Sequence, residues 1–527
     1  MTTVSASARW GSVGLGLGGG AVAAASLPPF DLWPLAFLGV ALFLFACEDR
    51  PLGTRTLAGL AFGLGLFIPG LWWAQHFNWY GAALLMLIEA TFMAVAGAAM
   101  TPGRGRTLSA IGAITLLEAA RLSWPLGGLP IGGMALGQTN GPLLALARLA
   151  GPMGIVLGIV VIAAGARVAL TALAMRNTQA VEAGRRGLHA AALVSVVALG
   201  IAYGALAPSG GPALALRTVA AVQGGGPRGT SAEQVDPATV TKAHLKALAK
   251  VPKGTQLTVL PEDVVGLSRP LRGSWQSKAL SSAARSLSTT LLAGVTTPGG
   301  PTSFHNFVVA YGPRGQVLGA VEKVHRVPFG EYVPARSLLS HIADLSGVPK
   351  DAIVGTQPEI LTTPAGRLGV LISFEVFFSD RSGDAVAHGA TLLVVPTNTT
   401  SYPTSQMPAQ ELAAARLQAV ERGRDLVQAS PTGYSAIINN KGTVVARSSL
   451  SAQDVLLGTV ALRSGATPFS SVGSWPTLVL AAACLLAGQL RAHGPRLRRR
   501  RVAPPEGGGP APGALALSDE DPELEAT

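Results

Sequence analysis

The stretch that decides the fold runs from Gly369 to Asp380 and reads GVLISFEVFFSD. Its apolar first half predicts a buried strand, since a short apolar run is typical of a strand covered on both faces. The run ends abruptly at Ser373, and Phe374 and Glu375 follow directly. The stretch therefore predicts a strand that carries a candidate nucleophile at its end.

Two charged motifs upstream also lie at or just past the end of a predicted strand. Glu262 closes a Leu-Pro-Glu tripeptide after an apolar run, and Lys323 precedes the segment VPFGEYVP at 327–334. Nucleophilic acyl transfer needs a nucleophile, a base and a positive group for the oxyanion. Taken alone, a glutamate at a turn or a lysine after another charged residue is more often a solvated surface group. The spacing of the three motifs favours Glu262 as the base, Lys323 as the cation and Ser373 as the nucleophile.

The composition indicates a membrane protein. Of the 527 residues, 49% are hydrophobic and 13% are charged, whereas soluble proteins carry about 25% charged residues. The net charge of +12 does not indicate nucleic-acid binding, because many basic residues stand between apolar stretches and a cluster of arginines follows the last one. That distribution is typical of charges that set membrane topology. The two cysteines, Cys47 and Cys484, lie in apolar stretches, and the sequence predicts no disulfide framework, metal site or cofactor.

Eight apolar stretches approach the roughly 20 residues that cross a bilayer. They are residues 10–25, 32–47, 57–73, 82–100, 108–120, 153–173, 188–206 and 475–490. Arginines gather in alternate loops, which predicts by the positive-inside rule that the N-terminus and the arginine cluster lie in the cytoplasm. Residues 208–472 then lie outside the membrane on the opposite side. Before residue 208, the loops on the opposite side hold only Arg121 and Arg148, both of which we assign to the loop between the fifth and sixth stretches.

Between the seventh and eighth stretches the pattern changes to that of a soluble domain. Short β-branched runs alternate with helical segments over residues 216–462, which argues for strands covered by helices. The predicted organisation is a seven-span domain at 1–210, an extracytoplasmic α/β domain at 211–472, an eighth span at 473–491 and a tail at 492–527. The tail is rich in proline and glycine and then acidic, so we expect it to be disordered.

The order Glu262, Lys323 and a nucleophile at Ser373 resembles the nitrilase superfamily. VPFGEYVP and the apolar flanks resemble the apolipoprotein N-acyltransferases, bacterial plasma-membrane enzymes that add a third acyl chain to lipoproteins. The resemblance covers about residues 10–490. It implies a helical membrane bundle of about eight spans plus a four-layer αββα sandwich, with Glu262 as general base and Lys323 as electrophile. It also implies that Glu331 orients the lysine and that Glu375 supports the site.

Other positions resemble the family as well. In the membrane part these are Glu118, Gly132-Gly133 and Gln138-Thr139, and in the helix at 406–424 they are Arg416, Glu421 and Arg424. We interpret the last three as structural ion-pair formers. Glu89, inside the fourth span, is either a functional carboxylate or one side of a helix–helix hydrogen bond.

The resemblance implies a reaction in two halves. The nucleophile takes an acyl chain from a phospholipid, and the N-terminal amine of a diacylated apolipoprotein then takes it as an amide. The family nucleophile is a cysteine, whose pKa of about 8.5 lies within ~4 units of that of a carboxylate. Serine is much harder to deprotonate, and its ester is no more activated than the donor lipid.

Three interpretations of Ser373 follow. The chain is an N-acyltransferase that works with serine, or a weak or inactive homologue that binds lipid or lipoprotein as a scaffold, or a form engineered to trap the acyl-enzyme. The four charged residues Glu262, Lys323, Glu331 and Glu375 are all present. Their presence favours residual activity, recent loss or engineering over an old decay of the site.

Overall fold

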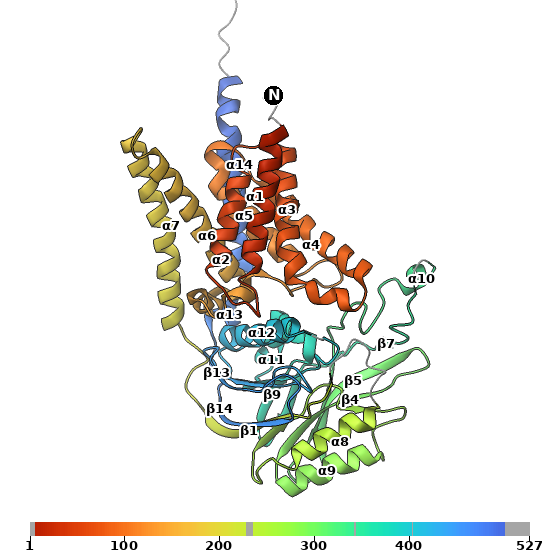
Figure 1. The fold of residues 1–527 in the computed structure, drawn as a ribbon. Helices are drawn as coiled ribbons and strands as arrows, with labels where there is room; N and C mark the ends of the chain where they lie inside the picture. Colours follow the sequence, from red (N-terminus) through yellow and green to blue (C-terminus); the bar gives the residue numbers. More distant parts are fainter. Residues whose placement is uncertain (1–5, 228–235, 342–343, 403, 501–527) are drawn as a thin grey trace, which may run out of the picture.

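The computed structural model of the chain describes residues 6–227, 236–341, 344–402 and 404–500. It has a helical region and an α/β domain, which lie one above the other in Figure 1. The chain builds most of the helical region first, continues into the α/β domain and returns through a last long helix. The predicted disorder of the tail falls largely on residues 501–527, which lie outside the described residues.

Helices form at each of the eight apolar stretches. Within the described residues they are α1 (Ala6–Ala24), α2 (Leu35–Ala46), α3 (Leu52–Gly70), α4 (Trp79–Ala99), α5 (Arg106–Arg121), α6 (Ala147–Met175), α7 (Ala180–Leu206) and α14 (Trp475–Arg500). The last helix continues past residue 490, where the prediction ended it, to Arg500. Arginine is a good helix former, so the polar end of α14 extends the apolar helix by propensity.

Five segments in the described part of the chain are long and apolar enough to cross a membrane. They are Leu52–Gly70, Trp79–Ala99, Pro142–Met175, Ala180–Leu206 and Trp475–Gly494. The other predicted spans fall short for different reasons. α2 has 12 residues, which extend about 18 Å against a hydrocarbon core of about 30 Å. α5 has 16 residues and is charged at both ends, and α1 has 19 but is rich in glycine. Five of the eight predicted spans are therefore candidates to cross a membrane by length and composition, and three further helices pack among them.

The glycines of α1 have a packing role. A Cβ at Gly20 would clash with the Phe62 carbonyl oxygen of α3, and one at Gly16 would clash with the Ala58 carbonyl oxygen. Small residues at these positions let the two backbones approach closely, as is usual for helices packed in a membrane.

The α/β domain contains two sheets. The first has strand order β14-β1-β2-β4-β5-β6, with β3 paired to β4 and β7 to β5. Its strands are β1 (Ala215–Gln223), β2 (Leu257–Val259), β3 (Val265–Gly266), β4 (Thr290–Pro298), β5 (Ser303–Tyr311), β6 (Val317–Glu322), β7 (Asp351–Ala352) and β14 (Asp454–Leu462). The second sheet has the order β13-β12-β11-β10-β9-β8. Its strands are β8 (Ile360–Thr363), β9 (Gly366–Val370), β10 (Leu392–Pro396), β11 (Leu426–Ala429), β12 (Ala436–Ile438) and β13 (Val444–Arg447).

The sheets and helices form four layers. An apolar core that includes Leu257 of β2 and Val394 of β10 fills the space between the two sheets. The outer face of the first sheet packs on α8 (Pro237–Leu248) and α9 (Trp275–Leu287). The outer face of the second packs on α11 (Ser379–Ala387) and α12 (Gln406–Arg422). The short helices α10 (Arg336–Leu339) and α13 (Pro468–Val472) lie outside these layers.

Helix α12 joins the α/β domain to the helical region, and Figure 1 shows it between the two. The Gln406 amide donates to the Pro69 carbonyl at 2.5 Å, and the Gln410 amide donates to the Gly70 carbonyl at 2.9 Å. Both glutamines also accept a backbone N–H from the helical region, and these come from Trp73 and Gly132. One face of α12 is therefore fixed to the end of α3.

Candidate active site

Strand ends bring the predicted cation and carboxylates together. Glu262 follows β2, and Lys323 follows β6 directly. The Lys323 ammonium donates to Glu262 at 2.9 Å and to Glu331 at 2.8 Å. Lys323 is 1% exposed. Burial alone lowers the pKa of Lys323, but the two carboxylates outweigh it and raise the pKa above its usual value. The lysine is therefore a fixed, charged group with two of its three N–H donors engaged.

The Glu331 carboxylate is held by its own loop. Its second oxygen accepts the Val327 backbone N–H at 2.8 Å, within the VPFGEYVP segment. The other oxygen accepts from Lys323. The conformation of this loop thus sets the position of the carboxylate that contacts the lysine.

Asn306 completes this cluster and was not predicted. It lies on β5, is 3% exposed, and donates from one amide nitrogen to Glu262 at 2.9 Å and to Glu331 at 3.2 Å. A polar amide in the apolar run FHNFVVAY is the signal that could have identified it. Asn306 keeps the two carboxylates together around Lys323.

Glu375 connects the lysine strand to the serine turn. One of its oxygens accepts the backbone N–H groups of Val324 at 2.7 Å and His325 at 3.1 Å. The other accepts the Ile372 N–H at 2.7 Å. Burial raises the pKa of Glu375 to about 7, against the lowering effect of these N–H donors. Glu375 touches backbone on both sides, so it positions Lys323 and Ser373 relative to each other.

Ser373 starts a short 3-10 helix, Ser373–Phe377, just after β9. Its φ of 53° lies in the left-handed region, which is costly for a residue with a side chain and is typical of functional sites. The hydroxyl is buried, and Thr397 Oγ1 donates to it at 3.3 Å. Among the described residues, no hydrogen bond joins Ser373 to Glu262 or Lys323.

Two further side chains extend the site beyond the prediction. Thr397, just after β10, is also hydrogen-bonded to the Glu411 carboxyl of α12. Glu411 is 1% exposed. Burial, helped by the nearby Glu262, raises the pKa of Glu411. Thr397 and Lys323 lower it, and the net pKa is about 8. In the sequence Glu411 is an ordinary glutamate of an amphipathic helix, and only the packing of α12 reveals its place.

Aromatic side chains of the helical region reach the edge of the site. The Tyr402 ring meets Trp73 edge-on at 5.2 Å and Phe77 at 5.4 Å. Burial raises the pKa of Tyr402, and Glu411 raises it further while Lys323 lowers it, so the phenol lies within electrostatic range of the charged cluster. Phe77 is 47% exposed, and Trp79 and Tyr80 nearby are also exposed. The side of the site that faces the helical region is therefore apolar and aromatic.

Three charged residues of the helical region form a second, separate cluster. The Arg121 guanidinium contacts Glu118 at 2.8 Å and Glu89 at 3.0 Å, and Arg121 is fully buried. Glu89 is therefore a partner in an ion pair between α4 and α5. The assignment of Arg121 and Arg148 to loops was wrong. Arg121 ends α5, and Arg148 lies at the start of α6 and donates to the Gly204 carbonyl at 2.7 Å.

The helix α12 residues that resembled family positions have structural contacts. Arg416 donates to Asn140 at 2.6 Å and to the Thr139 carbonyl at 2.7 Å. Arg424 donates to backbone carbonyls, including that of Gly465 at 2.7 Å. Their structural role stands, but their partners are carbonyl groups, so the two arginines are not ion-pair formers as predicted.

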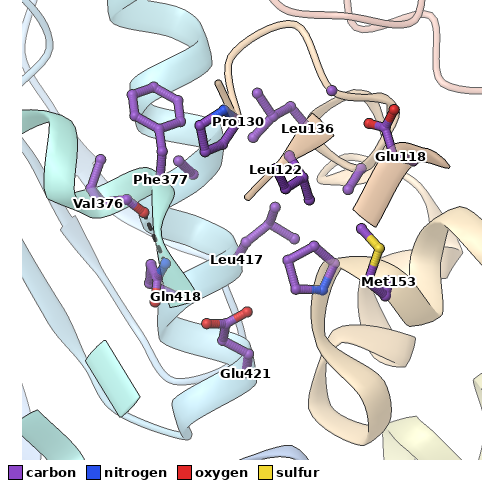
Figure 2. A pocket seen from close by; sticks show the side chains of 14 residues that line it. Glu118, Leu122, Pro130, Leu136, Met153, Val376, Phe377, Leu417, Gln418 and Glu421 are labelled. Atoms are coloured by element: carbon purple, nitrogen blue, oxygen red, sulfur yellow. Dashed lines mark hydrogen bonds between the residues drawn. The ribbon is translucent and has the colours of Figure 1, made fainter. Parts of the chain in front are cut away.

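A cavity lies between the two parts of the molecule, next to the serine turn. Figure 2 shows its lining, which combines Glu118 of α5 and Met153 of α6 with Val376, Gln418 and Glu421 of the α/β domain. Gln418 donates to the Val376 carbonyl at 2.9 Å. None of the five predicted site residues lines this cavity. Across the described ranges, no three His, Cys, Asp or Glu side chains converge as metal ligands.

Both parts of the chain are similar to known families. Residues 19–165 match the apolipoprotein N-acyltransferase N-terminal domain, and residues 218–467 match the carbon-nitrogen hydrolase domain. An apolipoprotein N-acyltransferase of Rhizobium leguminosarum bv. trifolii is 29% identical over 479 residues, which are 82% of this chain and 86% of the relative. One of Shewanella oneidensis is 27% identical over 507 residues, 90% of this chain and 94% of the relative. Among solved structures, Nit3 of Saccharomyces cerevisiae, from branch 10 of the nitrilase superfamily, is 18% identical and covers 47% of this chain and 90% of its own, with a TM-score of 0.36.

Proposed function

We propose that this chain, which belongs to the apolipoprotein N-acyltransferase family of carbon-nitrogen hydrolases, moves a fatty acyl chain from a phospholipid to the N-terminal amine of diacylated apolipoproteins. The observation that carries the assignment is the match of both parts of one chain to this family. The buried Lys323, held between Glu262 and Glu331, supports it at the level of the site.

In the first half of the reaction the Ser373 hydroxyl oxygen attacks the ester carbonyl carbon of the phospholipid. The oxyanion that forms is stabilised by Lys323, which has a third N–H to donate. The ester bond to the glycerol oxygen breaks, the lysophospholipid leaves with a proton, and the acyl chain stays on Ser373 as an ester.

In the second half the free amine of the lipoprotein attacks the acyl-serine carbonyl. Glu262, as general base, takes the proton that the amine loses. The bond to Ser373 breaks, the serine oxygen regains a proton, and the amide product leaves. The position of the serine is one where the family resemblance places a cysteine, so we propose that this chain works with a less activated ester than a thioester.

The substrates come from the bilayer. The aromatic residues Trp73 and Phe77 beside Tyr402 support access from the membrane side, because aromatic side chains concentrate at the membrane–water interface. We propose that the helices α1 to α7 and α14 all lie in the plasma membrane of a bacterium, with the α/β domain on the extracytoplasmic side. Reporter fusions after Gly210 should then report the outside and fusions after Arg501 the cytoplasm, and protease protection of residues 223–460 in spheroplasts would contradict this.

The function is tested with purified full-length protein and a labelled phospholipid. The chain as it stands should N-acylate a diacylated lipopeptide, and Ser373→Ala should not. Ser373→Cys should be faster, because the thiol is more acidic and the thioester more reactive. Glu262→Gln in the cysteine form should abolish transfer.

The alternative is an inactive homologue that binds lipid or lipoprotein. This alternative is supported if the unchanged chain transfers no more acyl groups than its Ser373→Ala form and the folded Ser373→Cys form is also inactive. If the unchanged chain transfers acyl groups as fast as its Ser373→Cys form, serine does not limit the rate in this site.

A further inference from the structure

The serine hydroxyl has a hydrogen-bonded route to a buried carboxyl other than Glu262. Thr397 Oγ1 lies 3.3 Å from Ser373 Oγ and is also hydrogen-bonded to Glu411 Oε1. All three side chains are buried. A hydroxyl has one proton and can accept as well as donate, so Thr397 can pass a proton between its two neighbours.

Among the described residues, Glu411 forms no salt bridge with a cation. Its second oxygen is buried without a hydrogen-bond partner among the described residues. The charged and titratable groups that act on Glu411 are Glu262 and Lys323, and Glu411 in turn acts on Tyr402. A buried carboxyl in this position holds its proton more tightly than one in water.

Glu262 is engaged elsewhere. One of its oxygens accepts from both Lys323 and Asn306, each at 2.9 Å. Within the described part of the chain it has no hydrogen bond with Ser373. The carboxylate beside the lysine is therefore poorly placed to serve the serine proton directly.

We propose that Ser373 exchanges its proton with Glu411 through the Thr397 hydroxyl. This relay rests on the proposed function and deepens it, because it states how a hydroxyl is activated when, within the described part of the chain, no histidine is hydrogen-bonded to it. Thr397 touches the reacting oxygen, and Glu411 acts through Thr397.

The proton transfers balance over the cycle. When Ser373 attacks the phospholipid, its proton moves to Thr397 and the Thr397 proton moves to the Glu411 carboxylate, while the leaving glycerol oxygen takes a proton from a water molecule. When the amine attacks, the Glu262 carboxylate takes its proton and releases it to the solvent, which replaces the proton taken from water in the first half. The departing serine oxygen takes the Thr397 proton, which Glu411 replaces. Each carboxyl ends the cycle as it began.

The pKa of Glu411 suits this role. A base of pKa about 8 is stronger than an ordinary carboxylate of pKa about 4.3. Because the efficiency of general-base catalysis rises with base strength, Glu411 removes a hydroxyl proton more readily than a solvated glutamate. The pKa also lies near neutral pH, so the group is present in both protonation states.

The test measures covalent labelling of Ser373 by a fluorophosphonate in the detergent-solubilised full chain, from pH 5.5 to 9. The serine oxygen bonds to phosphorus, fluoride leaves, and the serine proton follows the relay. The labelling rate should rise with pH and level off near the pKa of Glu411. Glu411→Gln should lower the rate at the plateau by about 100-fold or more, within the usual range for general-base catalysis, and should remove the rise.

Two pairs of variants separate the relay from a structural role. Thr397→Val should behave like Glu411→Gln, and Thr397→Ser should restore most of the rate because it keeps the hydroxyl. Glu421→Gln, a buried carboxyl on the same helix that accepts from Ser379 at 3.1 Å, should leave the labelling rate and its pH profile unchanged. In the Ser373→Cys background, Glu411→Gln should lower transfer less than tenfold, since a thiol needs a weaker base.

The relay is overturned if Glu411→Gln labels at the rate and pH profile of the unchanged chain, or if the unchanged chain is no more reactive than its Ser373→Ala form. Either result contradicts the relay only, and the proposed function is still tested separately by the acyl-transfer assay. Conversely, labelling that depends on Glu411, together with no transfer to the lipopeptide, would support the relay and refute the proposed function.

Discussion

The helical region and the α/β domain each contain a cluster in which a fully buried cation lies between two glutamates. In the helical region Arg121 lies between Glu89 and Glu118, and in the α/β domain Lys323 lies between Glu262 and Glu331. Charge and burial therefore do not distinguish the two clusters. The hydrogen bonds and the neighbours of each cation do distinguish the two clusters.

Arg121 makes five hydrogen bonds, to the two glutamates and to the carbonyls of Leu129 and Ile131. A guanidinium has five N–H groups. The single N–H of Nε, both of Nη1 and one of Nη2 are engaged, so Arg121 is bonded to four different groups of the helical region. Lys323 makes two such bonds and has three donors. Lys323 lies beside the strained serine turn, to which Glu375 links its segment, and we propose that it acts in the chemistry. Arg121 is a structural cross-link between helices.

The largest effect should come from removing the cation of the helical region. Arg121→Met leaves two buried carboxylates without their partner, which should destabilise the helical region by about 3–5 kcal/mol. The measurement is the thermal unfolding of the protein in detergent, and Arg104→Met, at an exposed arginine, is the control. An Arg121→Met form as stable as its control would break the comparison.

Removal of Lys323 should lower the rate of the reaction rather than the stability of the fold. Lys323→Met should lower the rate of acyl transfer by about 100-fold to 1,000-fold, the usual effect of losing one oxyanion donor. The exposed Lys278 offers the control Lys278→Met, which should keep full activity. A folded Lys323→Met form with normal kcat would show that the spare donor is not used.

Asn306 should have a smaller effect, because it orients the carboxylates without contacting the substrate. A hydrogen bond to a charged group contributes about 1.5–3 kcal/mol, so Asn306→Leu should lower kcat by roughly 10-fold to 100-fold. KM should change little. A variant that loses binding of the lipopeptide and keeps kcat would contradict this, because it would show that Asn306 contributes to substrate binding.

The smallest effect concerns a buried carboxyl whose cation is more distant. Glu421 lies 3.6 Å from the Arg422 guanidinium, and burial raises its pKa to about 6 against the lowering effect of that arginine. A raised folded-state pKa gives stability that is full below about pH 4.5 and is lost as pH rises through about 6. Glu421→Gln should flatten the fall in unfolding free energy between these pH values by about 2 kcal/mol. The same slope in both forms would contradict this.

Motifs at strand ends could be predicted from the sequence because the local pattern marks them. Glu262 and Lys323 each follow a strand of the first sheet, and Ser373 follows one of the second. A strand end with a polar residue is visible without knowledge of the tertiary structure. Their predicted catalytic roles stay predictions.

The other half of the site depends on packing. Glu411 acquires its burial and its raised pKa because α12 lies between the second sheet and the helical region. Thr397 is one of several polar residues in a loop, and only its contact with Ser373 singles it out. Similarly, apolar loop residues around α2 lengthened the predicted span beyond the helix that forms, since hydropathy does not mark where helical hydrogen bonding begins.

The anchoring of α12 has a consequence for protein production. The helix turns Gln406 and Gln410 toward the end of α3 and buries Met407 and Leu412. A soluble fragment of residues 211–472 would expose this face to water and leave the glutamine contacts unmade. Such a fragment should aggregate or lose the alignment of Glu411 with Thr397, so the catalytic half of this protein has to be expressed and purified together with its membrane helices.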